Sequence, residues 1–430
     1  MDMHTTRMPT TIPSRCARSA AAGFLILVAA CSPIASGGPT PRSAEPGASA
    51  VAPSPAASPV SSPAPSALGG WQRSPDQLAL VDAGLQGVIW SGSQFLAIAG
   101  VGSAMILDSA EGLAWHRQPA FETNGWNGPT ALAAGAGRVL AVGGGSNGPV
   151  AIWYSADGLA WTAAPDQDAF RSRDGAFQDA RAVIATDDGW LAVGGEFYNC
   201  TPRCPLRALV LTSRDGVQWM RLPETAALLH AEMSAIARGP SGYIAVGTVM
   251  VDPDRGEAGM RAAAWTSPDG RDWTRIGGAT TFDVPAGWAV AGPTDVVLRG
   301  IAVSGDRVVV MGDVRPAFGS ETTYVAPLAV AWWTDGGAWA PVELGLFADD
   351  RELAVSAVLG GFLAITGTAP DCLSGMREST DGVAWRCVGL GPAFTGYAVL
   401  GAAASPDVEV LVGRRVADPL IGAAWTRSIP

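Results

Sequence analysis

Residues 155–161 read SADGLAW, and close copies of this segment recur along the chain. The copies are SAEGLAW from Ser109, SRDGVQW from Ser213, SPDGRDW from Ser267 and STDGVAW from Ser379, with the one-residue-shorter TDGGAW from Thr334. An Asp-Gly pair between two β-rich segments is a strong hairpin signal, because glycine accepts a positive φ and aspartate bonds its own backbone. Each copy therefore predicts a tight turn between two strands.

A second repeat precedes each of these turns. A β-rich apolar run appears seven times: FLAIAG from Phe95, VLAVGG from Val139, WLAVGG from Trp190, YIAVGT from Tyr243, VVVMGD from Val308, FLAITG from Phe362 and VEVLVG from Val408. Their starts lie 44, 51, 53, 65, 54 and 46 residues apart. Most of these runs follow another apolar run across a turn such as TDDG, so each unit opens with a hairpin. Two hairpins give four strands per unit, and repeats of this length are typical of propellers.

The last unit ends before its fourth strand. In IGAAWTRSIP, Trp425 stands where Trp265 stands in its own unit, and no Asp-Gly turn follows. The missing strand is found at the start, where GGWQRSP around Trp71 mirrors GLAWHRQP around Trp115. We therefore predict an all-β fold: residues 71–430 form a seven-bladed β-propeller with four-stranded blades, closed by an N-terminal strand that pairs with the last blade. Six blades or an array of β-sandwiches are the alternatives.

The repeated Ser-x-Asp-Gly-x-x-Trp resembles the Asp-box, or bacterial neuraminidase repeat, of sialidases and of many propellers that are not enzymes. The resemblance covers about 360 residues, but this chain has one residue fewer than the family between Asp and Gly. It implies that the boxes lie on turns between third and fourth strands, on the face away from an active site. We expect the tryptophans to pack between blades and the turns to be structural. The turn residues predicted in this way are Asp157, Gly158, Trp161, Asp215, Gly216, Trp219, Asp269, Gly270, Trp273, Asp381, Gly382 and Trp385.

In propellers of this kind, the loops from second to third strands and from blade to blade line the opposite face, where ligands bind. These loops are long here: EFYNCTPRCPLR, TVMVDPDRGEAGMR, DVRPAFGSETTY and GGATTFDVPAGWAVAGPTD. Their arginine forks, carboxylates and aromatic rings suit a sugar or a peptide. The candidate ligand-face residues are Tyr198, Arg203, Arg207, Asp252, Asp254, Arg255, Asp283, Trp288, Arg315 and Tyr324. Solvated loop charge is the alternative for any one of them.

Catalytic parts are missing from the pattern. Sialidases need three arginines on a carboxylate, a Tyr-Glu nucleophile pair, an acidic proton donor and an RIP-like segment near the first blade. No such segment precedes Val88, and RSIP at the C-terminus is in the wrong place. Beyond residue 30 only His116 and His230 remain, too few for a metal site or a Ser-His-Asp nucleophile, so we expect neither cofactor nor metal. We favour a binding protein; a glycoside-active hydrolase or lyase that uses acidic loop residues is the competing hypothesis.

The first 30 residues have the parts of a signal peptide: an arginine-bearing start, the apolar run AAAGFLILVAA and small residues before a cysteine. The run is too short for a transmembrane helix. VAAC, residues 28–31, resembles the bacterial lipobox, which implies cleavage before Cys31 and acylation of its sulfur; an ordinary secretory peptide is the alternative. Residues 31–70 are rich in Pro, Ser, Ala and Gly and predict a disordered stalk. We expect an extracytoplasmic protein that its acyl chains hold on the outer face of the cell membrane, or on an outer membrane if the organism has one.

Charge and cysteines limit the partners. The formal net charge of −11 becomes −13 when the leader takes away three arginines and one aspartate, and an acidic chain repels phosphate backbones, which argues against nucleic acid. Beyond Cys31 four cysteines form two local pairs, Cys200 with Cys204 and Cys372 with Cys387. In an exported chain such pairs favour disulfides, each within one blade; free buried thiols are the alternative. We expect a monomer that binds a glycan, a peptide or an envelope protein.

Overall fold

The computed structural model describes residues 70–100, 105–119, 128–144, 148–173, 175–197, 206–251, 259–276, 280–284, 294–316, 328–346, 353–358, 360–367, 369–389 and 391–429. The chain divides into two units, residues 1–64 and residues 65–430. The first unit lies wholly outside the described residues, so the leader, the lipidation of Cys31 and the stalk stay predictions.

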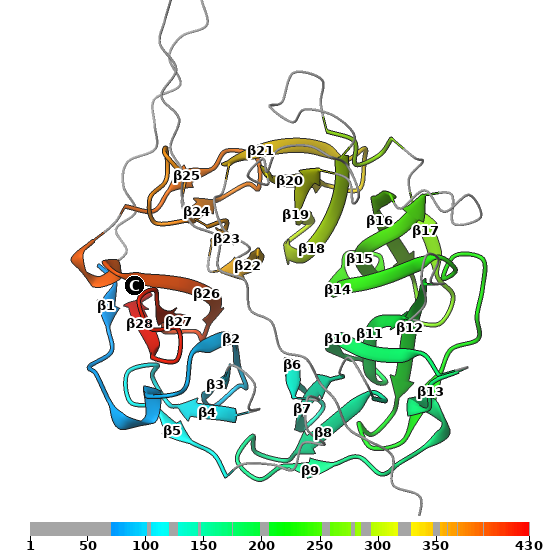
Figure 1. Ribbon diagram of the computed structural model, residues 1–430, viewed down its shortest axis with the longest axis horizontal. Coiled ribbons are helices and arrows are strands. Elements are labelled where there is room, and N and C mark those ends of the chain that lie inside the picture. The colour runs from blue at the N-terminus through cyan, green and yellow to red at the C-terminus, as the bar shows by residue number, and fades with distance from the viewer. Residues whose placement is uncertain are drawn as a thin grey trace, which may run out of the picture. The chain divides into compact units, whose positions relative to one another are not determined.

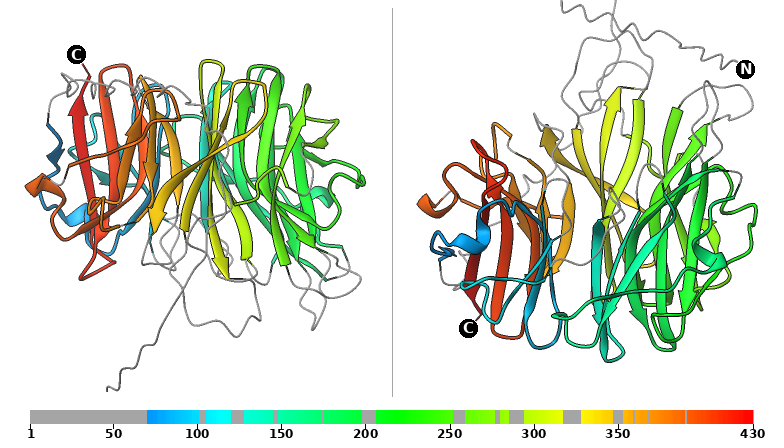
Figure 2. Two further views of the ribbon diagram at one scale, coloured as in Figure 1. Left: turned by 90° about the horizontal axis from the view of Figure 1, so that it is seen from above. Right: turned by 60° about the horizontal axis from the view of Figure 1, so that its bottom comes forward.

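Seven antiparallel four-stranded sheets form a ring (Figure 1). In six sheets the strand order follows the chain, and in the seventh it is β26-β27-β28 with β1 added at the rim, so the first strand of a blade faces the centre of the ring and the fourth lies at its rim. The side views show the strands standing side by side along the axis of the ring (Figure 2). The predicted all-β, seven-bladed propeller with four strands per blade is confirmed.

The strands have the following bounds. Blade 1 contains β2 (Leu85–Trp90), β3 (Phe95–Ala99), β4 (Met105–Ser109) and β5 (His116–Arg117). Blade 2 contains β6 (Pro129–Gly135), β7 (Arg138–Gly143), β8 (Ala151–Ser155) and β9 (Thr162–Ala163). Blade 3 contains β10 (Phe177–Thr186), β11 (Gly189–Phe197), β12 (Leu206–Ser213) and β13 (Trp219–Arg221). Blade 4 contains β14 (Ala231–Gly239), β15 (Gly242–Val251), β16 (Gly259–Ser267) and β17 (Thr274–Ile276).

The remaining blades follow the same order. Blade 5 contains β18 (Thr294–Ser304), β19 (Arg307–Pro316), β20 (Leu328–Thr334) and β21 (Ala340–Leu346). Blade 6 contains β22 (Ala354–Val358), β23 (Gly361–Ile365), β24 (Met376–Ser379) and β25 (Arg386–Cys387). Blade 7 contains β26 (Tyr397–Ala404), β27 (Val408–Arg415), β28 (Gly422–Ser428) and the closing strand β1 (Gln72–Arg73). Helices among the described residues are the 3-10 segments η1 (Leu78–Leu80), η2 (Asp168–Phe170) and η3 (Pro392–Phe394), and none there is long and apolar enough to cross a membrane.

Antiparallel order gives the ring two different sides. The turns from first to second strands and from third to fourth strands lie on one side, which we call the turn side. The connections from second to third strands and from blade to blade start on the other side, the loop side. The seven apolar runs of the sequence are the second strands of the blades, as predicted.

One hydrophobic cluster fills each seam between neighbouring blades. Between blades 2 and 3, for example, Leu140 of β7 packs with Ala192 and Leu211 of blade 3. Each of the seven clusters also contains or contacts one tryptophan from the start of a fourth strand: Trp71, Trp115, Trp161, Trp219, Trp273, Trp339 and Trp385. Truncation of a buried aromatic side chain of this size to alanine costs ~3–5 kcal/mol, so these residues stabilise the contacts between blades.

We call the turn formed by each copy of the repeated segment a box turn. The box turn of blade 3, residues 213–219, shows how the repeated residues act. The Ser213 hydroxyl accepts a hydrogen bond from the Gly216 amide at 2.8 Å and donates one to Oδ1 of Asp215 at 3.2 Å. The same carboxylate oxygen accepts bonds from the amides of Val217 and Gln218, at 2.9 and 2.8 Å. The indole N–H of Trp219 then closes the turn on the Gly216 carbonyl at 3.1 Å. Gly216 has φ +74°, a conformation that L side chains rarely adopt, so glycine is needed there.

Other blades repeat this turn. The carboxylates of Asp157, Asp269 and Asp381 accept the same two amide bonds, and each turn is closed by an indole N–H on a glycine carbonyl. The amide bonds hold the pKa of Asp157, Asp215 and Asp269 below its usual range. In blade 1 Glu111 replaces the aspartate, yet Ser109 and Trp115 keep their bonds to Gly112. The polar groups that repeat in the motif are therefore used within the turn itself.

The ring closes as the sequence predicts. Gln72 and Arg73 of β1 pair with Thr426 and Trp425 of β28, and the Ser74 amide donates to the Ala424 carbonyl at 2.8 Å (Figure 1). The N-terminal strand therefore supplies the fourth strand that blade 7 lacks.

The register of blade 7 differs from the prediction by one residue. In six blades the first residue of the apolar run pairs with the Ser or Thr of the box, for example Val139 with Ser155. In blade 7 the cross-strand pair at the equivalent position is Glu409 with Arg427. The apolar run of this blade is therefore aligned with the other six runs when it is counted from Glu409 and not from Val408. The side chains of Glu409 and Arg427 are both buried and their ion pair is formed within the sheet. A hydropathy pattern misses this position because it assigns no buried site to a glutamate.

Arg427 connects the closing elements. Its guanidinium lies 4.4 Å from the centroid of the Trp71 ring and donates a 3.0 Å hydrogen bond to Glu378 of blade 6. Trp71 also meets the ring of Phe394 edge-on at 6.2 Å. The cation and the aromatic ring therefore hold strand β1 against both blade 7 and the seam with blade 6.

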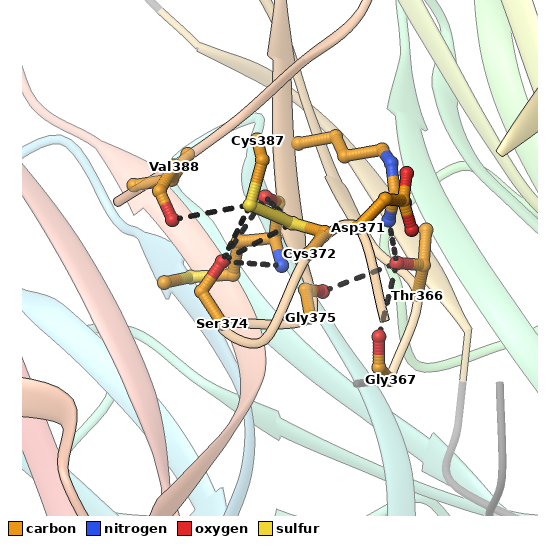
Figure 3. Close-up of a disulfide and its surroundings, with 10 residues drawn as sticks. Thr366, Gly367, Asp371, Cys372, Ser374, Gly375, Cys387 and Val388 are labelled. Atoms are coloured by element: carbon orange, nitrogen blue, oxygen red, sulfur yellow. Dashed lines mark hydrogen bonds and ion pairs between the residues drawn. A yellow bond between two sulfur atoms is a disulfide. The ribbon is translucent and has the colours of Figure 1, made fainter. Parts of the chain in front are cut away.

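Blade 6 carries a disulfide. Cys372, in the connection between β23 and β24, is bonded to Cys387 of β25, with Ser374 beside both sulfur atoms (Figure 3). The predicted pair Cys372–Cys387 within one blade is confirmed. Cys200 and Cys204 lie outside the described residues.

Candidate functional site

Polar side chains gather where the innermost strands approach the loop side. In β2, β6, β10, β14, β18 and β26 the pairing with the second strand shifts by one residue, which is the mark of a β-bulge. Bulges aim a side chain away from the regular alternation of a strand and are common beside functional sites. The residues that the pairing skips are Gln86, Thr130, Arg181, Ser234, Arg299 and Leu400, of which all but Leu400 are polar.

Arg181 joins the innermost strands of blades 3 and 4. Its guanidinium donates a 2.9 Å hydrogen bond to Glu232 of β14 and a 3.2 Å bond to Asp179 of its own strand. The same group lies 5.1 Å from the centroid of the Phe197 ring, at the loop-side end of β11. Two carboxylates and an aromatic ring therefore hold this arginine in one orientation.

A second cluster lies on the outer part of blade 3 and is centred on Glu196 of β11. This buried carboxylate accepts hydrogen bonds from Gln178 at 2.8 Å, from Arg221 at 3.0 Å and from the Arg173 amide at 3.3 Å. Burial opposes ionisation of Glu196, but the bonds from Gln178, Arg221 and the Arg173 amide outweigh it and lower its pKa. The lowered pKa favours the charged form of Glu196, which suits its role as the acceptor of these three hydrogen bonds.

Glu224 extends this cluster toward solvent. Its two carboxylate oxygens pair with Arg207 at 3.0 Å and with Arg173 at 3.3 Å. The Arg207 side chain is about a quarter exposed, and that of Arg173 is 44% exposed. Their guanidiniums are oriented by Glu224 and remain accessible to a ligand.

The clearest property of this region is the number of buried polar atoms without a hydrogen bond. Of the twelve such side-chain atoms found among the described residues, seven lie at the loop-side ends of blades 3 and 4. They are Gln178 Oε1, Asp179 Oδ1, Arg221 Nε and Nη2, His230 Nδ1, Ser234 Oγ and Thr248 Oγ1. Buried polar atoms without a partner are rare in folded proteins and are met by ordered water or by a ligand. The set includes donors and acceptors, and His230 has a left-handed backbone with φ +54°, a conformation uncommon outside glycine.

A smaller cluster occupies the loop side of blade 5. Asp313 is buried, accepts a 2.9 Å bond from the bulge residue Arg299, and also pairs with Arg315. The side chains of Arg299 and Arg315 are 37% and 42% exposed. One buried carboxylate therefore presents two arginines to solvent.

Three of the ten candidate ligand-face residues can be placed. Arg207 belongs to the Glu224 cluster of blade 3, Arg315 to the Asp313 cluster of blade 5, and Asp283 pairs with Arg261 at 3.2 Å beside blade 4. These three residues stand beside different blades, and none of the contacts among the described residues joins one of them to another. The other seven lie outside the described residues: Tyr198, Arg203, Asp252, Asp254, Arg255, Trp288 and Tyr324.

From the sequence we expected ligand residues in the loops. We therefore missed Glu196, Arg181 and Asp313, which are part of strands. A signal was present for two of them, since Glu196 and Asp313 follow the glycine that ends the apolar run, in VGGE and VMGD. Within the described ranges no three His, Cys, Asp or Glu side chains are arranged to hold a metal ion.

Comparisons with known proteins agree with the fold. No protein-family model matches the sequence, and no curated protein is detectably similar to it. The solved structure of YCF48 bound to D1 peptide is similar, with a TM-score of 0.50 and 14% identity, over 84% of this chain and 97% of that one. YCF48 from Cyanidioschyzon merolae (TM-score 0.42, 12% identity, 83% and 98% covered) and an ancestral GH74 enzyme (0.48, 13%, 82% and 47%) are also similar. At these identities the likeness to YCF48 shows the propeller fold alone.

Proposed function

We propose that this protein is an extracytoplasmic binding module whose propeller takes a peptide or protein segment on the loop side of blades 3 and 4. The observation that carries the proposal is the pair of solvent-accessible guanidiniums, Arg173 and Arg207, that Glu224 orients on the loop side of blade 3. A polypeptide offers backbone carbonyl oxygens and side-chain carboxylates, which accept hydrogen bonds from such guanidiniums. In the structure of YCF48 the ligand is a peptide, which supports this class of partner.

The ion pairs of the site favour binding over catalysis. A glycosidase needs an acid whose pKa is raised and a second carboxylate at a set distance from it. In blade 3 the pKa of Glu196 is lowered, and Glu224 is bound by two arginines. The guanidiniums of Arg173 and Arg207 are instead suited to carboxylates or carbonyl oxygens of a partner.

The test is a selection from a phage-displayed random peptide library on the purified full-length chain. Affinities of the selected peptides are then measured by fluorescence anisotropy for Arg173→Gln/Arg207→Gln and for the matched turn-side control Arg214→Gln/Arg271→Gln. We expect roughly tenfold weaker binding to the first variant and less than about twofold weaker binding to the control. Equal losses of peptide affinity in both variants would show that the loop side is not the binding site. Selected peptides whose affinity neither variant changes would show the same. Turnover of a panel of nitrophenyl glycosides would favour the enzyme instead.

We also propose that acyl chains on Cys31 hold the module at a membrane and that residues 31–70 act as a stalk. The lipobox-like VAAC and the Pro- and Ser-rich composition behind it support this anchoring. Replacing Cys31 with serine should release the protein from the membrane fraction and abolish labelling with a palmitate analogue. A variant that stays membrane-bound and labelled would disprove the lipid anchor.

A further inference from the structure

Two cavities adjoin each other on the turn side, which is the side away from the proposed peptide site. The first has a volume of about 860 Å³ and lies between the turns of blades 3 and 4; the second has about 910 Å³ and lies between those of blades 4 and 5. Tyr243 and Pro268 line both cavities, so the two are neighbours across the turns of blade 4 and we treat the pair as one groove. We call it the turn-side groove. Each half lies within the range of ligand-binding pockets, ~300–1,000 Å³.

An irregular box turn forms one wall of the groove. In blades 3 and 4 the indole N–H of Trp219 and Trp273 closes the turn on a glycine carbonyl. The turn of blade 5 is one residue shorter, and there the Thr334 hydroxyl donates to the Gly337 carbonyl at 3.0 Å. No corresponding indole bond from Trp339 occurs in the described part of the chain. Trp339 rests against Phe282, with 5.3 Å between ring centroids, and lines the groove. Trp339 therefore contributes an aromatic surface to this wall of the groove.

The charges along the groove are mainly negative. Two arginines line it, Arg214 and Arg271. Six aspartates line it: Asp187, Asp188, Asp215, Asp269, Asp306 and Asp335.

Three of these carboxylates, Asp187, Asp215 and Asp269, have a pKa below its usual range. The backbone amides of the box turns lower the pKa of Asp215 and Asp269, and the bond from Arg238 lowers that of Asp187. The box turns engage only Oδ1 of Asp215 and Asp269 in the described bonds. The groove therefore carries fixed negative charge beside an aromatic wall, and this combination favours a cation that is joined to an apolar group.

We propose that the turn-side groove binds a lysine- or arginine-rich polypeptide segment, with an apolar side chain of that segment packed against Trp339. Charge complementarity selects this occupant, because an acidic or neutral segment would gain nothing from six aspartates. The groove lies on the turn side of blades 3 to 5, whereas Arg173 and Arg207 lie on the loop side of blade 3, so the protein would hold one partner on each side. The proposal stands independently of the peptide site on the loop side.

The experiment uses the full-length protein and a fluorescein-labelled hexapeptide of five lysines and one leucine, with a hexapeptide of five glutamates and one leucine as the comparison. The groove variant is Asp306→Asn/Asp335→Asn. The control variant is Glu111→Gln/Asp407→Asn, which changes the net charge equally on the turns of blades 1 and 7. All four side chains are exposed, so both variants should melt at the wild-type temperature.

We expect the lysine peptide to bind wild type, to bind the groove variant about tenfold more weakly at low salt, and to bind the control variant within about twofold. Binding should weaken further as salt screens the charges. Equal losses in the two variants would show attraction by the overall negative charge and overturn the proposal. So would binding of the glutamate peptide with similar affinity, or no binding of the lysine peptide.

Discussion

Replacing Trp71 with alanine tests how the ring is closed. Trp71 is half-buried, lies edge-on to Phe394 and stacks beneath the Arg427 guanidinium. Truncation of a fully buried aromatic costs ~3–5 kcal/mol, and partial burial lowers this figure. The contact with Arg427 adds ~0.5–1 kcal/mol, so we expect a loss of about 3 kcal/mol in the free energy of unfolding. For a domain of this size that corresponds to a fall in Tm of roughly 5 °C.

The neighbouring residue provides the control. Gln72 is exposed, and its backbone pairs with Thr426 as that of Arg73 pairs with Trp425, so Gln72→Ala should change stability by less than about 0.5 kcal/mol. Calorimetry measures the Tm of both variants, and hydrogen exchange followed by mass spectrometry measures opening of individual strands. In Trp71→Ala, the amides of β28 should exchange faster because strand β1 detaches from them, whereas those of β11 should not change. Equal melting temperatures for Trp71→Ala and Gln72→Ala, with unchanged exchange in β28, would refute this account of closure.

Three further predictions concern the blades. The folded pKa of Asp215 lies below its unfolded value of ~3.9, so its contribution to stability is present above about pH 4 and is lost as the pH falls toward the folded value. Asp215→Asn should therefore show a smaller drop in Tm than wild type between about pH 6 and pH 3. An equal drop in the two proteins would contradict this. Cys372 and Cys387 are 15 residues apart, so their replacement by serine should cost ~3 kcal/mol in chemical denaturation, and a reducing agent should destabilise wild type more than this variant. Trp219→Ala should cost ~3–5 kcal/mol, whereas the adjacent Met220→Ala, at a side chain exposed by 67%, should cost less than about 0.5 kcal/mol; similar melting curves for the two would show that the box tryptophan does not hold the seam.

Most of the fold was predictable because its signals are local. Asp215 and Gly216 act on amides two and three residues away, so the turn can be recognised from seven letters of sequence. Closure was predictable for a related reason, since Trp71 has neighbours that match those of Trp115. The register of blade 7 was not predictable, because the buried Glu409 is tolerated in the sheet only through its pairing with Arg427, eighteen residues further on.

The candidate site was predicted only in part. Arg207 was found as a loop residue, but the residue that orients it, Glu224, is in the connection after β13. Arg181 and Glu232 are separated by 51 residues and meet only because blades 3 and 4 are adjacent in the ring. Nothing in the sequence near either residue indicates the other. The turn-side groove was not expected at all, although the one-residue deletion in TDGGAW, which shapes one of its walls, is visible in the sequence.

By itself the sequence determined the number of blades, the place of the turns and the strand that closes the ring. These features depend on hydrogen bonds and hydrophobic alternation within a few residues, and such interactions leave a repeating pattern. Only the tertiary structure decided which carboxylate holds which arginine, which buried atoms lack a partner and where the groove lies. Those properties depend on distances between blades, which are set by the packing of tryptophans and aliphatic side chains in the seams and not by the spacing of residues along the chain.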